Sequence, residues 1–409
     1  VPSSYLESAF AILKTELSRG ELNMLNQKTG NRELAYIVKV LETKDLEGYD
    51  NVYYVRVNSW WCVAPKDIKL GDLVVYFEID SKLPANDARF AFMEKRKFLV
   101  KTQKMCKVVS QGLILPLSEF PELKRCKEGD FVTDKLHVEK YDPDAINEGS
   151  VKSKVSDFQR AVDRHPKFFK NPIVKYLMKY KTARWLFSKI FCKKKDKCQW
   201  PEWLPKTGSE RIQNMPHLFG CKDKYIITEK VDGASTSFIL NEKDKYIVCS
   251  HNVIKNPDKN SAGGNFYKTN IWAESGANYN IESVLRSLKK DLKLKTAAIQ
   301  GETYGDGIQK RNYSLKNKHG FVVFHIWFDG VRIPIKDMIA ICDKYHIPHV
   351  HVYNYEYSIP DTVEQIIDDV DNSKSNIDGG DIEGFVFYSQ DGQQNFKCVS
   401  PNFLMKYHR

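Results

Sequence analysis

One lysine in this chain stands where a nucleophile for covalent chemistry would be expected. Residues 228–235 read Thr-Glu-Lys-Val-Asp-Gly-Ala-Ser, so Lys230 lies two residues before Asp232 and its Asp-Gly turn signal. The residues from Tyr225 to Thr228 are apolar or β-branched, which predicts a strand that ends near the lysine. Flanking charges and partial burial can lower a lysine pKa from about 10 toward neutrality, so that the free amine attacks a phosphorus atom. The competing interpretation is a hairpin turn with a solvated lysine.

Four later segments carry further groups that such chemistry needs. Each combines an apolar run with a carboxylate, an aromatic ring or a lysine. Attack on a polyphosphate requires its charge to be screened, so we expect a divalent metal held by carboxylates. The segments are residues 299–305 with Glu302, 321–326 with Phe324, 382–387 with Glu383, and 395–398 with Lys397.

Together the five segments resemble motifs I, III, IIIa, IV and V of the ATP-dependent ligase and capping-enzyme superfamily. Within it, the chain is most similar to the RNA ligases that carry an N-terminal OB domain and seal 3′-OH RNA ends in nicked duplexes. Residues 205–214 resemble that group's lead-in to the catalytic domain, and residues 110–113 resemble its OB signature. The resemblance covers most of the chain.

The resemblance assigns a role to each motif residue. Lys230 attacks the α-phosphorus of ATP, releases pyrophosphate and holds AMP as a phosphoramidate. AMP then passes to a 5′-phosphate end, which a 3′-OH end attacks. The implied catalytic residues are Lys230, Asp232, Glu302, Glu383 and Lys397, and the three carboxylates surround Mg²⁺ or Mn²⁺.

The resemblance also implies a nucleotide pocket. Phe324 stacks on adenine, with Phe321 as the alternative because either ring could be core. Asp232 also contacts the ribose. The other expected nucleotide contacts are Glu229 and Thr228 at the adenine edge and a metal-bound water, Lys397 and Lys406 at the α-phosphate, and Arg211, Gln213 and Asn214 as weaker base and ribose candidates.

One segment departs from the family pattern. Related ligases place an arginine in a Ser-Arg-Asn type motif after the nucleophile, whereas this chain has His251 followed by Asn252. A histidine, with a pKa near ~6.5, does not supply the permanent forked charge of arginine toward a 5′-phosphate. We expect His251, Asn252 and Lys255 to contact nucleic acid, with Lys255 compensating.

The formal charge of +11 is concentrated in one segment. Residues 164–197 contain 12 Lys/Arg and one acid, which leaves 51 basic and 51 acidic residues in the rest of the chain. Aromatic and basic residues interleave there, a pattern typical of phosphate and base contact. We favour a helical connector that contributes to nucleic-acid binding. A solvated helix face and a membrane-surface helix are the alternatives.

The N-terminal part alternates like a small β-barrel. The expected strands are residues 33–42, 52–63, 73–79, 98–109 and 112–115, about the count of an OB fold that binds oligonucleotides. Trp60, Trp61, Lys101, Lys104 and Lys107 are the candidate contacts, although one of the tryptophans is equally well explained as a core residue.

The predicted fold class is α+β, with the OB barrel before a nucleotidyltransferase domain of antiparallel sheets and helices. We place the OB domain and a leading helix in residues 1–145, the connector in 146–200 and the catalytic domain in 201–409. Expected helices cover residues 281–292, 338–345 and 363–370, and residues 368–381 read as an acidic loop. No run approaches the ~20 apolar residues of a membrane span. Nine cysteines without paired spacing indicate a reducing compartment, so we expect an intracellular protein, cytoplasmic or nuclear. We also expect a monomer.

Two rival functions use the same features. A capping guanylyltransferase shares the lysine chemistry but carries its OB domain after motif V, and only 12 residues follow Lys397 here. An inactive relative that only binds nucleic acid would be expected to lose the lysine or the carboxylates, and none is missing.

Overall fold

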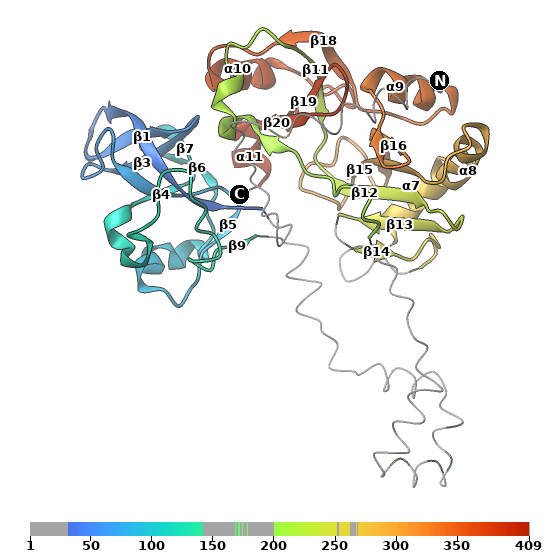
Figure 1. Cartoon of the computed structure of the whole chain (residues 1–409), viewed down its shortest axis with the longest axis horizontal. Coiled ribbons are helices and arrows are strands. Elements are labelled where there is room, and N and C mark those ends of the chain that lie inside the picture. Colours follow the sequence, from blue (N-terminus) through green and yellow to red (C-terminus); the bar gives the residue numbers. More distant parts are fainter. Residues whose placement is uncertain are drawn as a thin grey trace.

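The computed structural model describes residues 32–141, 168, 171, 174, 178, 200–251, 253–261, 267 and 269–408. These residues form an N-terminal domain, residues 32–141, that lies against a larger C-terminal domain, residues 200–408 (Figure 1). Residues 1–31, where a leading helix was expected, and most of the basic connector lie outside the described part of the chain.

A curled antiparallel sheet forms the N-terminal domain. Its strand order is β3-β2-β1-β4-β8. The hairpin β6–β7 packs beside β3, where the backbone N–H of Val63 donates to the Ser110 hydroxyl. The strands are β1 (Ala35–Leu46), β2 (Tyr49–Val57), β3 (Trp60–Pro65), β4 (Leu73–Phe77), β6 (Thr102–Met105), β7 (Val108–Gln111) and β8 (Leu113–Pro116), with the short pair β5 (Ser81–Lys82) and β9 (Glu139–Lys140).

Two of the expected strands were wrong because turns interrupt them. Residues 52–63 are split into β2 and β3 by a turn at Asn58, whose φ is 49°. Within residues 98–109, Cys106 and Lys107 also have positive φ and form the tip of the β6–β7 hairpin. The turn after β2 places Trp60 in the core with no exposed surface, whereas Trp61 stays partly exposed and stacks on Tyr54.

Two sheets form the C-terminal domain. The first has the order β10-β20-β19-β11-β18 and the second β14-β13-β12-β15-β16-β17. The first contains β10 (Glu210–Arg211), β11 (Lys224–Lys230), β18 (Val352–Ser358), β19 (Gly384–Ser389) and β20 (Asn395–Val399). The second contains β12 (Ala234–Leu240), β13 (Tyr246–Ser250), β14 (Ile254–Lys255), β15 (Ala297–Gly305), β16 (His319–Phe328) and β17 (Val331–Arg332).

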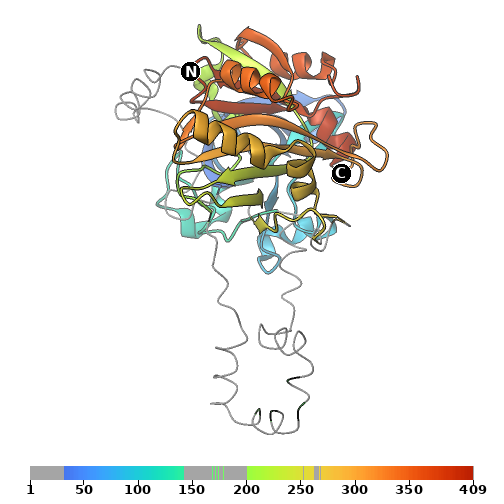
Figure 2. The ribbon, with the colours of Figure 1, turned by 90° about the vertical axis from the view of Figure 1, so that its right-hand side faces the viewer.

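Apolar helix faces cover these sheets. Ile281, Val284, Leu285 and Leu288 bury one face of α8 (Ile281–Asp291), as the helical spacing predicts. In Figure 2, α8 and α9 face the viewer on the side away from the N-terminal domain. The other helices are α7 (Ile271–Asn278), α9 (Ile335–Lys344), α10 (Val363–Asn372) and α11 (Pro401–Tyr407).

The helix predictions were right for α8, α9 and α10 in place and type. The predicted start of the acidic loop, residue 368, was too early, because α10 continues to Asn372. A capping box at Thr362 begins this helix. The sequence analysis missed α7 and α11. Both are short, and α11 follows a strand with only Ser400 between them.

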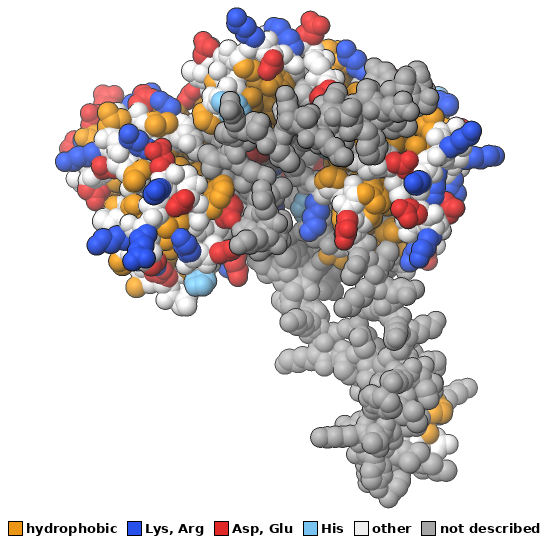
Figure 3. All heavy atoms as spheres, viewed as in Figure 1, with side chains coloured by type: hydrophobic (Ala, Val, Ile, Leu, Met, Phe, Trp, Pro, Cys, Tyr) orange, Lys and Arg blue, Asp and Glu red, His pale blue; other side chains and the backbone are white. Residues whose placement is uncertain are grey.

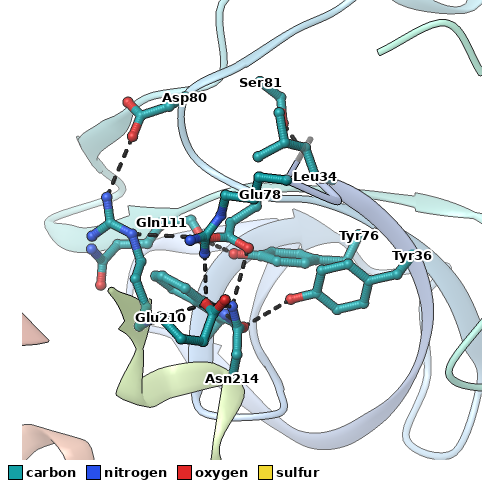
Figure 4. A network of polar contacts seen from close by, with 12 residues as sticks. Leu34, Tyr36, Tyr76, Glu78, Asp80, Ser81, Gln111, Glu210 and Asn214 are labelled. Atoms are coloured by element: carbon teal, nitrogen blue, oxygen red, sulfur yellow. Dashed lines mark hydrogen bonds and ion pairs between the residues drawn. The ribbon is translucent and has the colours of Figure 1, made fainter. Parts of the chain in front are cut away.

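A buried polar network joins the two domains (Figure 4). The Arg32 guanidinium lies 2.6 Å from Glu78 of the N-terminal domain and 2.7 Å from Glu210 of β10. The Asn214 side chain donates to both carboxylates, and its oxygen accepts from the Trp60 indole at 2.6 Å. The partners on both sides are therefore bonded to one another across the interface.

Among the helices of the described residues, none has the length and apolar character that crossing a bilayer requires.

Candidate active site

A cavity of about 210 Å³ lies where the two sheets of the C-terminal domain meet. The turn at residues 231–233 passes from β11 in the first sheet to β12 in the second, so it brings the ends of both sheets to the cavity. The lining residues are Thr207, Gly208, Ser209, Thr228, Glu229, Lys230, Val231, Ser235, His251, Glu302, Phe324, His325, Val350, Val386, Tyr388 and Lys397.

Lys230 is the last residue of β11 and lines this cavity, as the strand-end prediction requires. Its Nζ donates to the Glu383 carboxylate at 2.5 Å. The expected fall in its pKa is wrong for this structure. Burial lowers the pKa of Lys230, but the nearby Glu383, Glu302 and Asp232 outweigh that effect and raise it above its usual value.

Two glycines bring these charged groups together. A Cβ on Gly233 would lie 2.3 Å from the Thr303 carbonyl oxygen, so only glycine lets the turn approach the strand of Glu302. A Cβ on Gly384 would lie 2.0 Å from the Cys398 carbonyl oxygen on the neighbouring strand β20. The glycines beside Asp232 and Glu383 are thus required by close packing, and neither has a positive φ.

Asp232 is buried in the turn, where its backbone N–H donates to the Tyr313 hydroxyl at 2.6 Å. The Nε2 of His408 lies 3.2 Å from its Oδ1, while its Oδ2 is buried without a hydrogen-bond partner. Tyr313 and Gln309 belong to the same loop, and the Gln309 side-chain amide donates to the Gly233 carbonyl oxygen at 3.2 Å. This loop fixes the turn that follows the lysine.

The three predicted metal ligands do not form a ready-made metal site. Among the residues that the structure describes, no three His, Cys, Asp or Glu side chains are grouped closely enough to hold an ion. Glu383 is occupied by its ion pair with Lys230. Burial raises the pKa of Glu302 to about 8, and Lys230 opposes that rise. Glu302 and the unpartnered oxygen of Asp232 are the two acceptors that fit a hard cation, which commonly takes one or two carboxylates and phosphate oxygens.

Lys397 lies on β20 and lines the cavity near Lys230. Burial lowers its pKa well below the usual value, and the cations of Arg211 and Lys230 lower it further. By contrast, Lys406 does not line the cavity. Its ammonium is exposed on α11 and pairs with Asp381 at 2.7 Å, because the helix turns that face away from the site.

A β-bulge decides which aromatic ring faces the cavity. On β15, Gln300 pairs with His325 and the next residue, Gly301, pairs with Val323, so Phe324 is an extra residue in β16. Neighbouring residues of a regular strand face opposite sides, but the bulge lets both Phe324 and His325 line the cavity. The alternative ring, Phe321, has no exposed surface and belongs to the core.

The residues before Lys230 are more deeply engaged than expected. Thr228 is completely buried, and its hydroxyl is directed to the Val386 carbonyl oxygen at 3.5 Å. The Glu229 carboxylate accepts from the Ser375 hydroxyl at 2.5 Å and from the Asn376 backbone at 3.1 Å. Both line the cavity, but these bonds tie Glu229 to the loop that follows α10.

His251 lies in the cavity wall and is part of a hydroxyl cluster. The Thr207 hydroxyl lies 3.1 Å from His251 Nδ1 and 2.5 Å from the Ser235 hydroxyl. Lys255 does not line the cavity, since its ammonium sits 4.2 Å above the Trp272 ring. Asn252 lies outside the described residues.

Arg211 and Gln213 belong to the domain interface and do not line the cavity. The Arg211 guanidinium reaches Asp80 of the N-terminal domain at 3.3 Å, and the Gln213 carbonyl oxygen accepts from the Ser59 backbone at 3.2 Å. Strand β10 pairs with β20, which places Arg211 beside Lys397 in the sheet but directs its side chain to the other domain.

The predicted lysines of the N-terminal domain lie on or beside the β6–β7 hairpin. Lys104 and Lys107 are exposed, and Lys101 is half-buried near the Tyr141 ring. The helix α11 of the C-terminal domain lies against β6, so the hairpin is next to the element that follows the active-site strand β20 (Figure 1). On the face shown in Figure 3, basic and acidic side chains are interspersed over both domains.

Sequence reasoning missed several residues of the cavity and its surroundings. Thr207 and Ser209 flank a glycine in the lead-in segment 205–214, which was singled out without a role for either. Tyr388 and His325 carry no local signal, since each lies in an apolar strand. His408 was missed because its distance of 176 positions from Asp232 hides their contact in the fold.

Known proteins share both parts of the chain. Residues 223–408 match the family model for RNA ligase, and residues 34–117 match a model for an OB-fold domain. The solved Naegleria gruberi RNA ligase with PPi is 23% identical, with a TM-score of 0.70 over 92% of this chain and 99% of that one. A mutant of it with ATP and Mn is 24% identical, with the same TM-score and coverage. No curated protein matches in sequence.

These matches confirm the predicted architecture of an OB fold before a catalytic domain of mixed sheets and helices. Lys230 and the segments that carry the later motifs all fall inside the residues that match the RNA ligase model. Residues 223–408 therefore match the RNA ligase family, and residues 34–117, which match an OB-fold domain, precede them in the chain.

Proposed function

We propose that this protein is an RNA ligase that uses ATP, forms a covalent adduct of AMP with Lys230, passes the AMP to a 5′-phosphate end and seals a nick to an RNA 3′-OH end. The observation that carries the proposal is one cavity that holds Lys230, Lys397, Glu302 and the Phe324 ring together. An amine nucleophile, a second amine, a carboxylate and an aromatic face are what transfer of a nucleotide to lysine requires.

The two lysines divide the work. The Lys230 ammonium first loses one proton, and its Nζ then forms the bond to the α-phosphorus as the bond to pyrophosphate breaks, with loss of a second proton to leave the N–H of the phosphoramidate. Glu383, 2.5 Å from Nζ, orients the amine and is placed to accept a proton from it. Lys397 lies in the same cavity and stabilises the charge that develops as pyrophosphate leaves.

A divalent cation fits beside these groups. Glu302 and Asp232 Oδ2 would hold it, together with phosphate oxygens of ATP. When bound, it screens the polyphosphate and neutralises carboxylates. Because those carboxylates raise the pKa of Lys230 here, their neutralisation favours the free amine. The similar Naegleria structures hold ATP, AMP, PPi or Mn, which supports this choice of cofactors.

Adenine is held by stacking on Phe324, whose ring the bulge turns into the cavity. His251 and Thr207 at the cavity wall are placed to meet the 5′-phosphate end, since both offer hydrogen bonds at the rim near Ser235. The OB-fold lysines Lys104 and Lys107 and the basic connector contact the duplex backbone. We place all of these in one monomer.

Incubation with labelled ATP and then labelled GTP, followed by a denaturing gel, tests the reaction. We expect a labelled protein from ATP alone, whereas label from GTP indicates a guanylyltransferase. Lys230→Ala should abolish the adduct yet still seal a pre-adenylylated 5′ end, because that step does not use the lysine. Lys224→Ala, at the exposed other end of β11, is the matched control and should label normally. A labelled Lys230→Ala protein overturns the proposal.

Binding to nicked duplex should weaken steeply with salt if these lysines contact phosphates. Neutralising Lys193, Lys194, Lys195 and Lys197, which lie outside the described residues, should flatten the slope of log affinity against log salt by up to ~0.9 for each phosphate that is no longer neutralised. Labelling with ATP should survive. An unchanged slope would mean that this segment is a solvated face.

A further inference from the structure

The C-terminal helix α11 joins the OB domain to the active site. It follows the strand of Lys397 after a one-residue turn, and the backbone N–H of Ser400 in that turn donates to the Glu383 carbonyl oxygen at 2.9 Å. On its other side, α11 lies against β6 of the OB domain, and its Leu404 packs on the apolar cluster around Trp60 and Val57. Figure 1 places α11 between the two domains.

The end of this helix reaches Asp232. His408 follows the last residue of α11 and its backbone N–H donates to the Leu404 carbonyl oxygen at 2.9 Å. Its ring lies 5.9 Å from the buried Phe403 ring, centroid to centroid, which fixes the direction of the imidazole. Its Nε2 lies 3.2 Å from Asp232 Oδ1.

The contact between His408 and Asp232 is incomplete. The two atoms are within ion-pair distance, but His408 Nε2 and Asp232 Oδ2 are both buried without a hydrogen-bond partner. An unpaired buried polar atom costs about 1–3 kcal/mol, so such atoms in a site are usually explained by a bound group. Asp232 is therefore held from one side and open on the other.

We infer that His408 is a positioning residue of the ligase, and that through α11 the OB domain sets the position of the Asp232 carboxylate. Asp232 lies in a turn between the two sheets, where its side chain has no strand neighbour to hold it. His408 supplies that support, and Leu404, four residues earlier, ties the same helix to the OB core. Docking of the OB domain and the geometry beside Lys230 are thereby linked. This inference rests on the proposed adenylylation of Lys230.

Adenylylation rates of four single variants and one double variant of the full chain test it. His408→Ala should lower the rate at saturating ATP about tenfold and change the KM for ATP less than twofold, because the residue positions a group and does not bind ATP. His408→Gln, which keeps a nitrogen near Nε2, should recover most of the rate. Lys406→Ala is the matched control on the exposed face of α11 and should keep the parent rate.

Leu404→Ala supplies the link to the OB domain. It should lower the rate about threefold, and it should add nothing in the His408→Ala background, since both act through one contact. Independent effects that multiply would overturn the link, and a parent-like His408→Ala or one that only raises KM would overturn the positioning role. Thermal midpoints identify a variant that fails to fold, in which case His408→Gln decides. A parent that forms no adduct with ATP overturns the proposed function as well.

Discussion

One cluster of buried charge lies at the domain interface and another at the cavity, and the two are built differently. The pairing of β10 with β20 connects them, because it places Arg211 beside Lys397. At the domain interface, Glu78 is paired with Arg32 and accepts a hydrogen bond from the Asn214 amide nitrogen. The side-chain oxygen of Asn214 accepts from the Tyr36 hydroxyl and the Trp60 indole. Beside the cavity, Asp232 Oδ2 is buried without a hydrogen-bond partner, as Arg211 Nη1 is at the interface. Of the two lysines that line the cavity, Lys230 has a carboxylate partner at 2.5 Å and Lys397 has a strongly lowered pKa.

This difference separates a structural cluster from a reactive one. Buried charges cost free energy unless they are paired and hydrogen-bonded. At the interface both oxygens of Glu78 are bonded, although Arg211 Nη1 and the Gln213 side chain are buried without hydrogen-bond partners. At the cavity, burial raises the pKa of the Glu302 carboxyl and lowers the pKa of the Lys397 amine. Shifts of this kind are typical of sites that bind or react. Both clusters share β20 and β10 as neighbours, which explains why Arg211 of the interface lowers the pKa of Lys397 in the cavity.

Breaking the structural cluster should give the largest effect. Glu78→Ala leaves Arg32 and Arg211 buried without their shared carboxylate and should lower the free energy of unfolding by about 3–5 kcal/mol. Urea unfolding followed by tryptophan fluorescence measures it, with Trp60 in the cluster as a reporter. Glu282→Ala, which breaks an exposed pair on α8, is the control at about 0.5 kcal/mol. Equal losses would contradict the comparison.

Breaking the reactive cluster should lower the rate of adduct formation and should not lower the free energy of unfolding. Lys397→Ala should slow formation of the protein-AMP adduct by about 10²–10³-fold, since it removes a preorganised amine from beside the leaving pyrophosphate. It should not destabilise the fold, because a lysine whose pKa is lowered by folding costs free energy at neutral pH. Lys406→Ala should react within twofold of the parent. Rapid-quench measurements compare them, and a similar loss in both variants would remove Lys397 from its role.

Two phenylalanines of β16, Phe321 and Phe324, test the same contrast between structural and reactive residues. Phe324→Ala should raise the KM for ATP roughly tenfold, within the ~1–3 kcal/mol that stacking on a base contributes, and keep the thermal midpoint. Phe321→Ala, in the core, should instead destabilise the protein by about 3–5 kcal/mol. A normal KM in Phe324→Ala would show that the ring only fills the cavity wall.

The last effect expected is a pH dependence of stability without metal. Folding raises the pKa of Glu302 from 4.5 to about 8, so its contribution is fully present below pH 4.5 and is lost as the pH rises through about 8. In EDTA, the parent should therefore lose more thermal stability than Glu302→Gln between these pH values. Glu78 shifts in the same direction at the interface and remains in both proteins. Parallel curves for parent and variant would exclude the raised pKa.

The sequence by itself determined the chemical groups and their local supports. The apolar run before Lys230 and the Asp-Gly after it are local signals, and they predicted the strand that ends at the lysine and the turn that follows. The same holds for α8, whose apolar face is periodic, and for Glu302 and Glu383 beside their strands. Local pattern is enough for these features because each is set by residues within one turn or one strand.

Only the tertiary structure decided how those groups act on one another. The bulge that turns Phe324 inward is a matter of register between β15 and β16. The raised pKa of Lys230 depends on carboxylates from other strands and from the turn, against the effect of burial. Arg211 was expected at the base or ribose and Lys406 at the α-phosphate, yet Arg211 contacts the other domain and Lys406 pairs with Asp381 on the surface. Electrostatic effects depend on distances between residues far apart in sequence, and those distances exist only in the folded chain.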